Sequence, residues 1–107
     1  MSDHFGISES SYQLIIETLR KFPEIDQATI FGSRAKGNFK KGSDIDIAIK
    51  GGNISPSLAL DIAAVLNEKK PIPYFIDVIS YDHISNQNLK DHIDRVGIIL
   101  YSKNSNT

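Results

Sequence analysis

The sequence predicts an α/β (α+β) fold in which helices flank one β-sheet. Segments with the apolar spacing of helices alternate with short apolar segments that have the period of strands, in the order αβαβαβα. The chain has 107 residues, 40% of them hydrophobic and 23% charged, which is ordinary for a globular protein. This length allows one hydrophobic core but no separate substrate-binding lobe, so we expect residues 1–107 to form a single domain.

Composition also narrows the functional classes. A net charge of −1 argues against a protein that wraps nucleic acid, because such proteins are usually strongly basic. The absence of cysteine excludes disulfides, a thiolate metal site and a thiol nucleophile, and is compatible with a reducing compartment. The sequence shows no signal peptide and no apolar run of membrane-spanning length. We therefore expect a cytoplasmic protein with no membrane contact and no direct nucleic-acid binding.

The first half of the chain contains a helix followed by two strands. Ser10 and Gln13 have the spacing of a capping box, and the apolar stripe after them predicts a helix ending near Phe22, before Pro23. The next segments are a strand, one helical turn, a basic loop and a second strand. They cover Gln27–Phe31, Arg34–Gly37, Asn38–Ser43 and Asp44–Lys50. Phe39 in the loop is either a packing anchor, which we favour, or a surface on which a base stacks.

The second half adds two helices and two strands. Ser55 and Pro56 have the residue types of a helix cap and a first helical position. A mostly apolar strand, a helix that Ser85 can cap and a short closing strand follow. The expected bounds are a helix to about Lys69, a strand over Tyr74–Ile79, a helix over Ser85–Gly97 and a strand over Ile98–Tyr101.

The stretch Ala28–Ile49 carries the strongest functional signal. Gly32-Ser33 is followed, after ten residues, by Asp44-x-Asp46, and roughly 0.005 occurrences of this joint pattern are expected from composition alone. Residues two apart on a strand point to the same face, which would place the two Asp44 and Asp46 Cα atoms about 6.6 Å apart. A rigid platform of carboxylate oxygens is what Mg²⁺ requires. The pattern therefore predicts a magnesium site on this strand.

Asp77 is the candidate for a third carboxylate. It interrupts the apolar segment Tyr74–Ile79, where a lone charge is costly unless it is paired or binds a metal. The alternative is that Asp77 faces solvent at the edge of a sheet or pairs with a lysine.

The residues around Gly32 could bind phosphate. Gly32 would let the backbone approach phosphate oxygens, and Ser33 offers a hydroxyl and the amides of a helix start. The alternative is an ordinary strand-to-helix turn with Ser33 as its cap, and both descriptions can hold together. Arg34 and Lys36 would lie within reach of a triphosphate, although surface solvation explains any single basic residue equally well. For Lys40 and Lys41, phosphate binding and simple exposure to solvent are equally compatible with the sequence. The three histidines lack metal-ligand spacing and are expected to be surface residues; they are His4, His83 and His92.

The segments GSRAKG and SDIDIAI resemble the nucleotidyltransferase domain of the DNA polymerase β superfamily. In so short a chain, they are most similar to the minimal nucleotidyltransferase (MNT) antitoxins of the HEPN/MNT toxin–antitoxin type. The resemblance implies a mixed sheet, with Asp44, Asp46 and Asp77 as catalytic residues and ligands of two Mg²⁺ ions. It also implies that ATP is bound by residues of the glycine turn, namely Gly32, Ser33, Arg34 and Lys36. The family often has arginine where Lys36 stands, so bidentate phosphate binding would be lost there.

The same resemblance implies a reaction and a partner. The expected activity is Mg²⁺-dependent transfer of AMP from ATP to a tyrosine of a HEPN ribonuclease toxin, with which the chain would form a hetero-oligomer. One alternative is transfer to a small molecule such as an aminoglycoside, against which the missing second lobe counts. Another alternative is a non-catalytic antitoxin that masks its partner. The intact carboxylates favour catalysis, because a mask does not need them.

Overall fold

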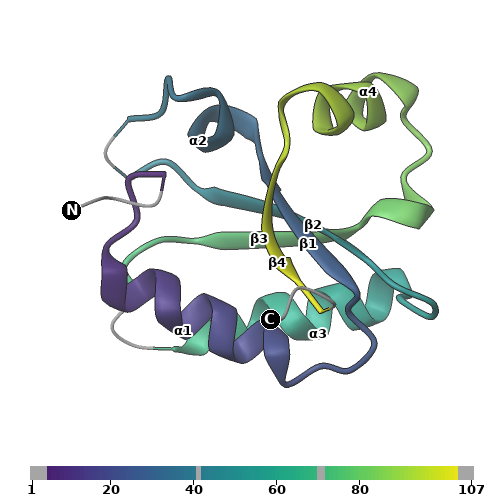
Figure 1. Cartoon of the computed structure of the whole chain (residues 1–107), viewed down its shortest axis with the longest axis horizontal. Coiled ribbons are helices and arrows are strands. Elements are labelled where there is room, and N and C mark those ends of the chain that lie inside the picture. The colour runs from purple at the N-terminus through teal and green to yellow at the C-terminus, as the bar shows by residue number, and fades with distance from the viewer. Residues whose placement is uncertain (1–4, 41, 70–71, 104–107) are drawn as a thin grey trace.

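The structure is a computed structural model that describes residues 5–40, 42–69 and 72–103. Helices and strands alternate along the chain (Figure 1). The elements are α1 (Glu9–Arg20), β1 (Gln27–Phe31), α2 (Gly32–Lys36), β2 (Ile45–Lys50), α3 (Pro56–Glu68), β3 (Ile76–Ser80), the 3₁₀ turn η1 (Tyr81–His83), α4 (Gln87–Val96) and β4 (Ile98–Ser102). This arrangement confirms the predicted α/β class.

The four strands form one mixed sheet in the order β3-β2-β1-β4. β1 is antiparallel to both β2 and β4, whereas β2 and β3 are parallel. A parallel pair needs a long crossover connection. The helix α3 supplies this crossover between β2 and β3.

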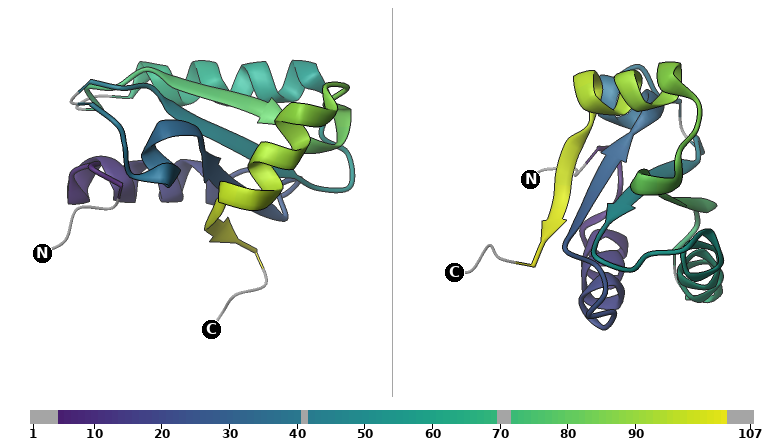
Figure 2. Two further views of the ribbon diagram at one scale, coloured as in Figure 1. Left: turned by 90° about the horizontal axis from the view of Figure 1, so that it is seen from above. Right: turned by 90° about the vertical axis from the view of Figure 1, so that its right-hand side faces the viewer.

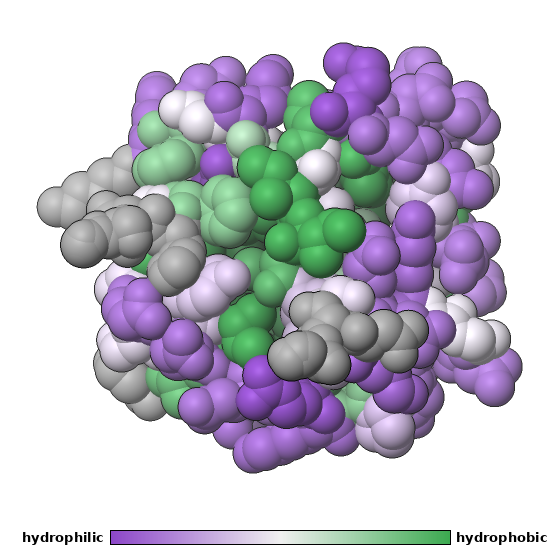
Figure 3. Space-filling model, viewed as in Figure 1, coloured by the Kyte–Doolittle hydropathy of each residue, from purple (hydrophilic) through white to green (hydrophobic). Residues whose placement is uncertain are grey.

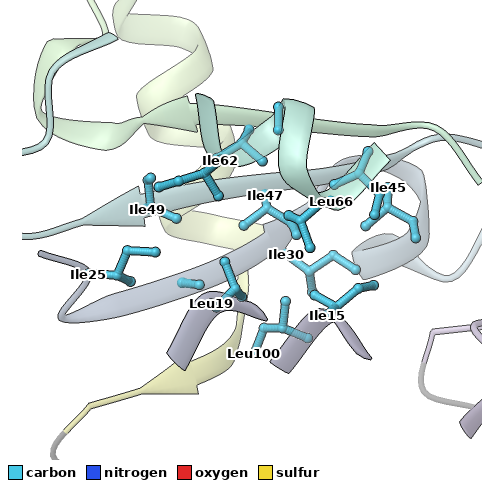
Figure 4. Packing of buried hydrophobic residues seen from close by; sticks show 14 of the residues in the cluster. Ile15, Leu19, Ile25, Ile30, Ile45, Ile47, Ile49, Ile62, Leu66 and Leu100 are labelled. Carbon is cyan, nitrogen blue, oxygen red and sulfur yellow. The ribbon is translucent and has the colours of Figure 1, made fainter. Parts of the chain in front are cut away.

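The main hydrophobic core lies between the sheet and the helices α1 and α3. Figure 2 shows these two helices on one side of the sheet, with α2 and α4 on the other. Alternate residues of β2 point to the core, so that Ile45, Ile47 and Ile49 are fully buried against residues such as Leu19 and Leu66 (Figure 4). The residues between these isoleucines, which include Asp46, therefore lie on the side of α2 and α4.

The helix that covers this second face is α4. It packs on the sheet through Ile93, which clusters with Phe31 from β1 and Ala48 from β2. Leu89 lies at the margin of the same cluster. This smaller core holds α4 beside the sheet face that carries Asp46.

The helix starts differ from the predicted caps by one or two residues. Ser8, rather than Ser10, caps α1 by accepting a hydrogen bond from the Ser11 amide at 3.3 Å. Asn86, rather than Ser85, caps α4 in the same way. Ser55 and Pro56 start α3 as predicted. The ends of α1 and α3 at Arg20 and Glu68 also fall short of the predicted Phe22 and Lys69.

Two strands also start later than predicted, and the side chain of Asn67 contacts the first residue of one of them. β3 begins at Ile76 rather than Tyr74, and the carboxamide of Asn67 in α3 bonds both the amide and the carbonyl of Ile76 at 2.8 Å. These bonds tie the outer side of the first β3 residue to the crossover helix. β2 begins at Ile45, one residue after the predicted Asp44.

The surface has one apolar region on an edge strand. Figure 3 shows hydrophobic surface gathered over β4, where Ile98 and Ile99 are 43% and 59% exposed. In the described part of the chain, β4 is the last strand of the sheet on this side. None of the described helices is long and apolar enough to span a bilayer.

Candidate active site

The turn between β1 and α2 brings Gly32 against Asp46. Phe31 is the register partner of Asp46 in the antiparallel pair, so the next residue turns directly beside this carboxylate. Gly32 has a φ of +77°, which L side chains rarely adopt. A Cβ atom at this position would lie 2.5 Å from Asp46 Oδ2. Glycine is therefore required here for two reasons, the backbone conformation and the proximity of Asp46.

The three predicted carboxylates gather at the β2–β3 pair. Asp46 and Asp77 are register partners across the parallel strands, and Asp44 lies one residue before β2. Asp46 is half-buried, while Asp44 and Asp77 are exposed. Burial raises the pKa of Asp46, and the charges of Asp77 and Asp44 raise it further, while His92 and Arg34 oppose this rise. The carboxylates are thus close enough to repel one another.

This donor set suits a hard divalent cation. Asp44, Asp46 and Asp77 offer only carboxylate oxygens, which Mg²⁺ prefers, and a cation between them would relieve their repulsion. Among the described residues, no group of three or more His, Cys, Asp or Glu is already arranged to hold a metal ion. The strands therefore bring the ligands to one place, and their side chains would have to turn inward around an ion.

Asp77 combines the two alternatives that its sequence context leaves open. It is solvent-exposed on the edge strand β3, as the structural alternative predicts. It also stands beside Asp46, as the metal-binding alternative requires. Within the described residues Asp77 forms no ion pair with a lysine, so the position is consistent with a ligand at an open edge.

Arg34 occupies a structural position rather than the phosphate-facing one that the sequence suggests. Its side chain is only 2% exposed. The guanidinium donates to the Ser43 carbonyl from Nε at 3.1 Å and Nη2 at 2.7 Å, and to the Phe5 carbonyl from Nη1 at 2.9 Å. It also lies 5.0 Å and 4.7 Å from the ring centroids of Phe39 and Tyr74. This geometry does not support the phosphate contact predicted for Arg34.

The remaining predicted phosphate ligands differ in their exposure to solvent. Lys36 is exposed at the end of α2, next to the left-handed Gly37 that ends this helix. Ser33 is half-buried in the first turn of α2, where Phe31 rather than Ser33 holds the cap position. Lys40 is exposed in the loop before β2, and Lys41 lies outside the described residues.

The aromatic residue in this loop has a packing role. The Phe39 ring faces the Arg34 guanidinium on one side and lies tightly against the backbone of Gly6. This arrangement supports the predicted packing anchor rather than a base-stacking surface. Together with Arg34, Phe39 connects the chain near Phe5 to the loop that leads to Asp44.

His92 is a site residue that the sequence does not reveal. The sequence predicts a surface histidine, but His92 of α4 is half-buried, and its Nε2 accepts a hydrogen bond from the Gly32 amide at 3.2 Å. Its ring meets the Phe31 ring edge-to-face, with centroids 6.1 Å apart. No spacing rule relates residues 60 positions apart, and only the packing of α4 on the sheet brings them together.

One protein-family model matches most of the chain. The model of the family described as "Polymerase beta, Nucleotidyltransferase" matches residues 13–106, which span α1 to β4. This match includes the Gly32 turn and all three aspartates. No curated protein matches the chain.

Solved structures show the same fold. A chain of a toxin–antitoxin crystal structure with AMP-PNP superposes with a TM-score of 0.72 and 22% identity, covering 87% of this chain and 74% of that one. A chain from the tri-AMPylated Shewanella oneidensis HEPN toxin in complex with its MNT antitoxin gives a TM-score of 0.67 and 20% identity, covering 89% and 72%. A chain of the MntA–HepT toxin–antitoxin gives 0.60 and 20%, covering 90% and 74%.

Proposed function

Because this chain belongs to the polymerase β nucleotidyltransferase family, we propose that it transfers AMP from ATP to a tyrosine of a HEPN ribonuclease toxin, in the cytoplasm. The observation that carries the proposal is the meeting of Asp44, Asp46 and Asp77 beside the Gly32 turn. Asp46 and Asp77 are paired on adjacent strands, next to a glycine whose backbone conformation and contact with Asp46 disfavour any side chain. This arrangement fits metal-assisted phosphoryl chemistry better than a structural role.

The proposed reaction replaces the phosphoanhydride bond between the α- and β-phosphates of ATP with a phosphoester bond to tyrosine. The tyrosine oxygen forms a bond to the α-phosphorus of ATP, the bond from this phosphorus to the β-phosphate oxygen breaks, and pyrophosphate leaves. The hydroxyl proton passes to a base, for which exposed Asp77 is the candidate. Mg²⁺ bound by the aspartates would neutralise the charge on the phosphate oxygens. The carboxylates would orient the α-phosphate through the Mg²⁺ that they would hold, and Ser33 and Lys36 would bind the rest of the triphosphate.

The acceptor in this proposal is a folded protein. Among the described residues, the nucleotide site uses the aspartates and the Gly32 turn, and no second lobe surrounds them to form a small-molecule cleft. The exposed positions of Asp44 and Asp77 leave the edge of the site open to a docking surface. The similar folds in toxin–antitoxin complexes support a HEPN partner, in a hetero-oligomer.

Mass spectrometry of the partner tests the proposal. The protein is incubated with ATP, Mg²⁺ and the HEPN protein encoded beside it. We expect each modified tyrosine to gain about 329 Da, the mass of one AMP residue added by phosphoryl transfer. The Asp44→Asn variant should bind the partner but leave its mass unchanged, because exposed Asp44 contributes to the charge of the site rather than to the core. EDTA should have the same effect as this substitution.

The alternative of masking gives a different result. If the wild type and Asp44→Asn suppress the ribonuclease equally, and neither changes the partner's mass, the protein acts by covering its partner. Replacing the partner with an aminoglycoside in the same assay addresses the small-molecule alternative, for which a mass gain on the drug would count.

A further inference from the structure

His92 connects the last helix to the turn that faces the aspartates. The Gly32 amide is one of the first amides of α2, which have no hydrogen-bond acceptor within their own helix. His92 Nε2 supplies the acceptor at 3.2 Å. In this contact Nε2 is the hydrogen-bond acceptor and carries no hydrogen of its own. The Gly32 amide is therefore directed at α4.

Several contacts fix the imidazole in this place. The ring packs edge-to-face on Phe31, the register partner of Asp46. The next residue, Ile93, is buried in the cluster that joins α4 to the sheet. His92 thus stands on a rigid helix and contacts the two residues, Phe31 and Gly32, that form the corner beside Asp46.

Direct chemical roles for His92 are less compatible with the geometry. Its Nε2 is engaged by the Gly32 amide, so this atom is not free to take a proton from an acceptor hydroxyl. A role in ordinary core packing would require no polar contact, whereas this nitrogen meets a backbone donor.

We propose that His92 is a positioning residue for nucleotidyl transfer, which holds the Gly32 turn through its amide so that the turn stays seated against the Asp46 carboxylate. The effect of His92 on catalysis rests on the proposed function, whereas the hydrogen bond to the Gly32 amide does not depend on that function. It assigns the Gly32 amide to α4 and leaves the triphosphate to Ser33 and Lys36. A loosened turn would let Asp46 move away from the reacting phosphate.

Two substitutions at His92 separate the hydrogen bond from the shape of the ring. His92→Phe keeps an aromatic ring against Phe31 but has no acceptor, and His92→Gln can place an amide oxygen near the position of Nε2. Hydrogen exchange of the Gly32 amide can be monitored by NMR in the absence of nucleotide and metal. The exchange should be about tenfold faster in His92→Phe than in the wild type. His92→Gln should restore most of the protection. His83→Phe is the matched control, because His83 is exposed and contacts Ser80 instead.

Kinetics then test the consequence. We expect His92→Phe to lower kcat for AMP transfer by about tenfold with little change in the KM for ATP, because the effect acts on positioning. His92→Gln should recover most of kcat, and His83→Phe should match the wild type. Equal exchange rates in the wild type and His92→Phe would overturn the proposed bond, whether or not the protein transfers AMP. Lost protection with unchanged kcat would overturn the positioning role, and a wild type that exchanges slowly but transfers nothing would refute the proposed function and, with it, this role.

Discussion

Gly32 and Gly37 both have a left-handed backbone, with φ values of +77° and +87°, but only one of them is crowded. A Cβ atom at Gly37 would meet nothing within 4 Å, whereas at Gly32 it would collide with the Asp46 carboxylate. Gly32 is the first residue of the short helix α2, and Gly37 directly follows its last residue. They therefore allow the cost of the backbone conformation to be separated from the displacement of Asp46.

We predict that Gly32→Ala and Gly37→Ala each lower the free energy of unfolding by about 1 kcal/mol, the cost of a left-handed alanine. Only Gly32→Ala should also lower the rate of AMP transfer, by about 100-fold, because Asp46 must move out of its place. Urea denaturation and the mass assay measure the two effects. Similar activity losses in both variants would show that the strain of the turn, rather than the contact with Asp46, controls catalysis.

At the scale of elements, the loop between α2 and β2 is held in place from inside. Arg34 donates to the carbonyls of Ser43 and Phe5 and lies between two aromatic rings. Lys36, two residues later, is exposed. The basic side chains of this segment therefore divide into one that orders the approach to Asp44 and one that faces solvent near the site.

We predict opposite effects of changing these two cations. Arg34→Lys should lower the free energy of unfolding by about 2 kcal/mol, because an ammonium cannot replace the two-pronged contact with Ser43 or the stacking between the rings. Lys36→Met should change stability by less than about 0.5 kcal/mol, as expected for an exposed side chain, but weaken ATP binding. Calorimetric titration with a non-hydrolysable ATP analogue measures binding. Weaker binding in Arg34→Lys without a loss of stability would restore the phosphate role of Arg34.

Periodicity and composition could predict the elements because they report local preferences. The alternation of isoleucines over Ile45–Ile49 reflects the two faces of one strand, and Ser55-Pro56 reflects the cap of one helix. The structure confirms both. The burial of Arg34 could not be predicted, because a short basic segment looks the same whether its residues face solvent or carbonyl groups. The partners of Arg34 lie 9 and 29 residues away.

Some features of the candidate site can likewise be predicted from local sequence patterns, whereas others depend on contacts between distant residues. The fixed spacing of Gly32-Ser33 and Asp44-x-Asp46 indicates the site, and the resemblance to a family adds Asp77 on the next strand. The contact between His92 and Gly32 depends on how α4 lies on the sheet, which no local pattern encodes. The raised pKa of Asp46 likewise depends on its burial and on charges brought together by the sheet.

At the scale of the whole molecule, the burial of the Asp46 carboxylate opposes folding, and its repulsion by Asp77 and Asp44 adds to this effect. The pKa of Asp46 is raised in the folded protein, so the stability that protonated Asp46 provides is lost as the pH rises through this pKa. At pH 7 the ionised group therefore destabilises the metal-free fold. Because both hydrophobic clusters contain residues of the same strands, we expect the described part of the chain to unfold as one unit.

We predict a single calorimetric transition with an enthalpy of about 60–80 kcal/mol at the midpoint. Mg²⁺ at ten times its dissociation constant should raise this midpoint by about 5 °C. In EDTA at pH 7, the Asp46→Asn variant should have a higher unfolding midpoint than the wild type. Adding Mg²⁺ should not shift the midpoint of this variant. An unchanged wild-type unfolding midpoint at millimolar Mg²⁺ would contradict the metal site. Two separate unfolding transitions would contradict the single domain.

The parallel pairing of β2 with β3 has a consequence for the time at which the site first exists. During synthesis on the ribosome, Asp44 and Asp46 emerge well before Asp77, because the crossover helix α3 must be made between them. His92 follows later still, 60 residues after the glycine that it contacts. A nascent chain that has released neither β3 nor α4 therefore has the first two aspartates but lacks Asp77 and His92. If the chain acts as proposed, nucleotidyl transfer would begin only once nearly all of the described fold has been translated.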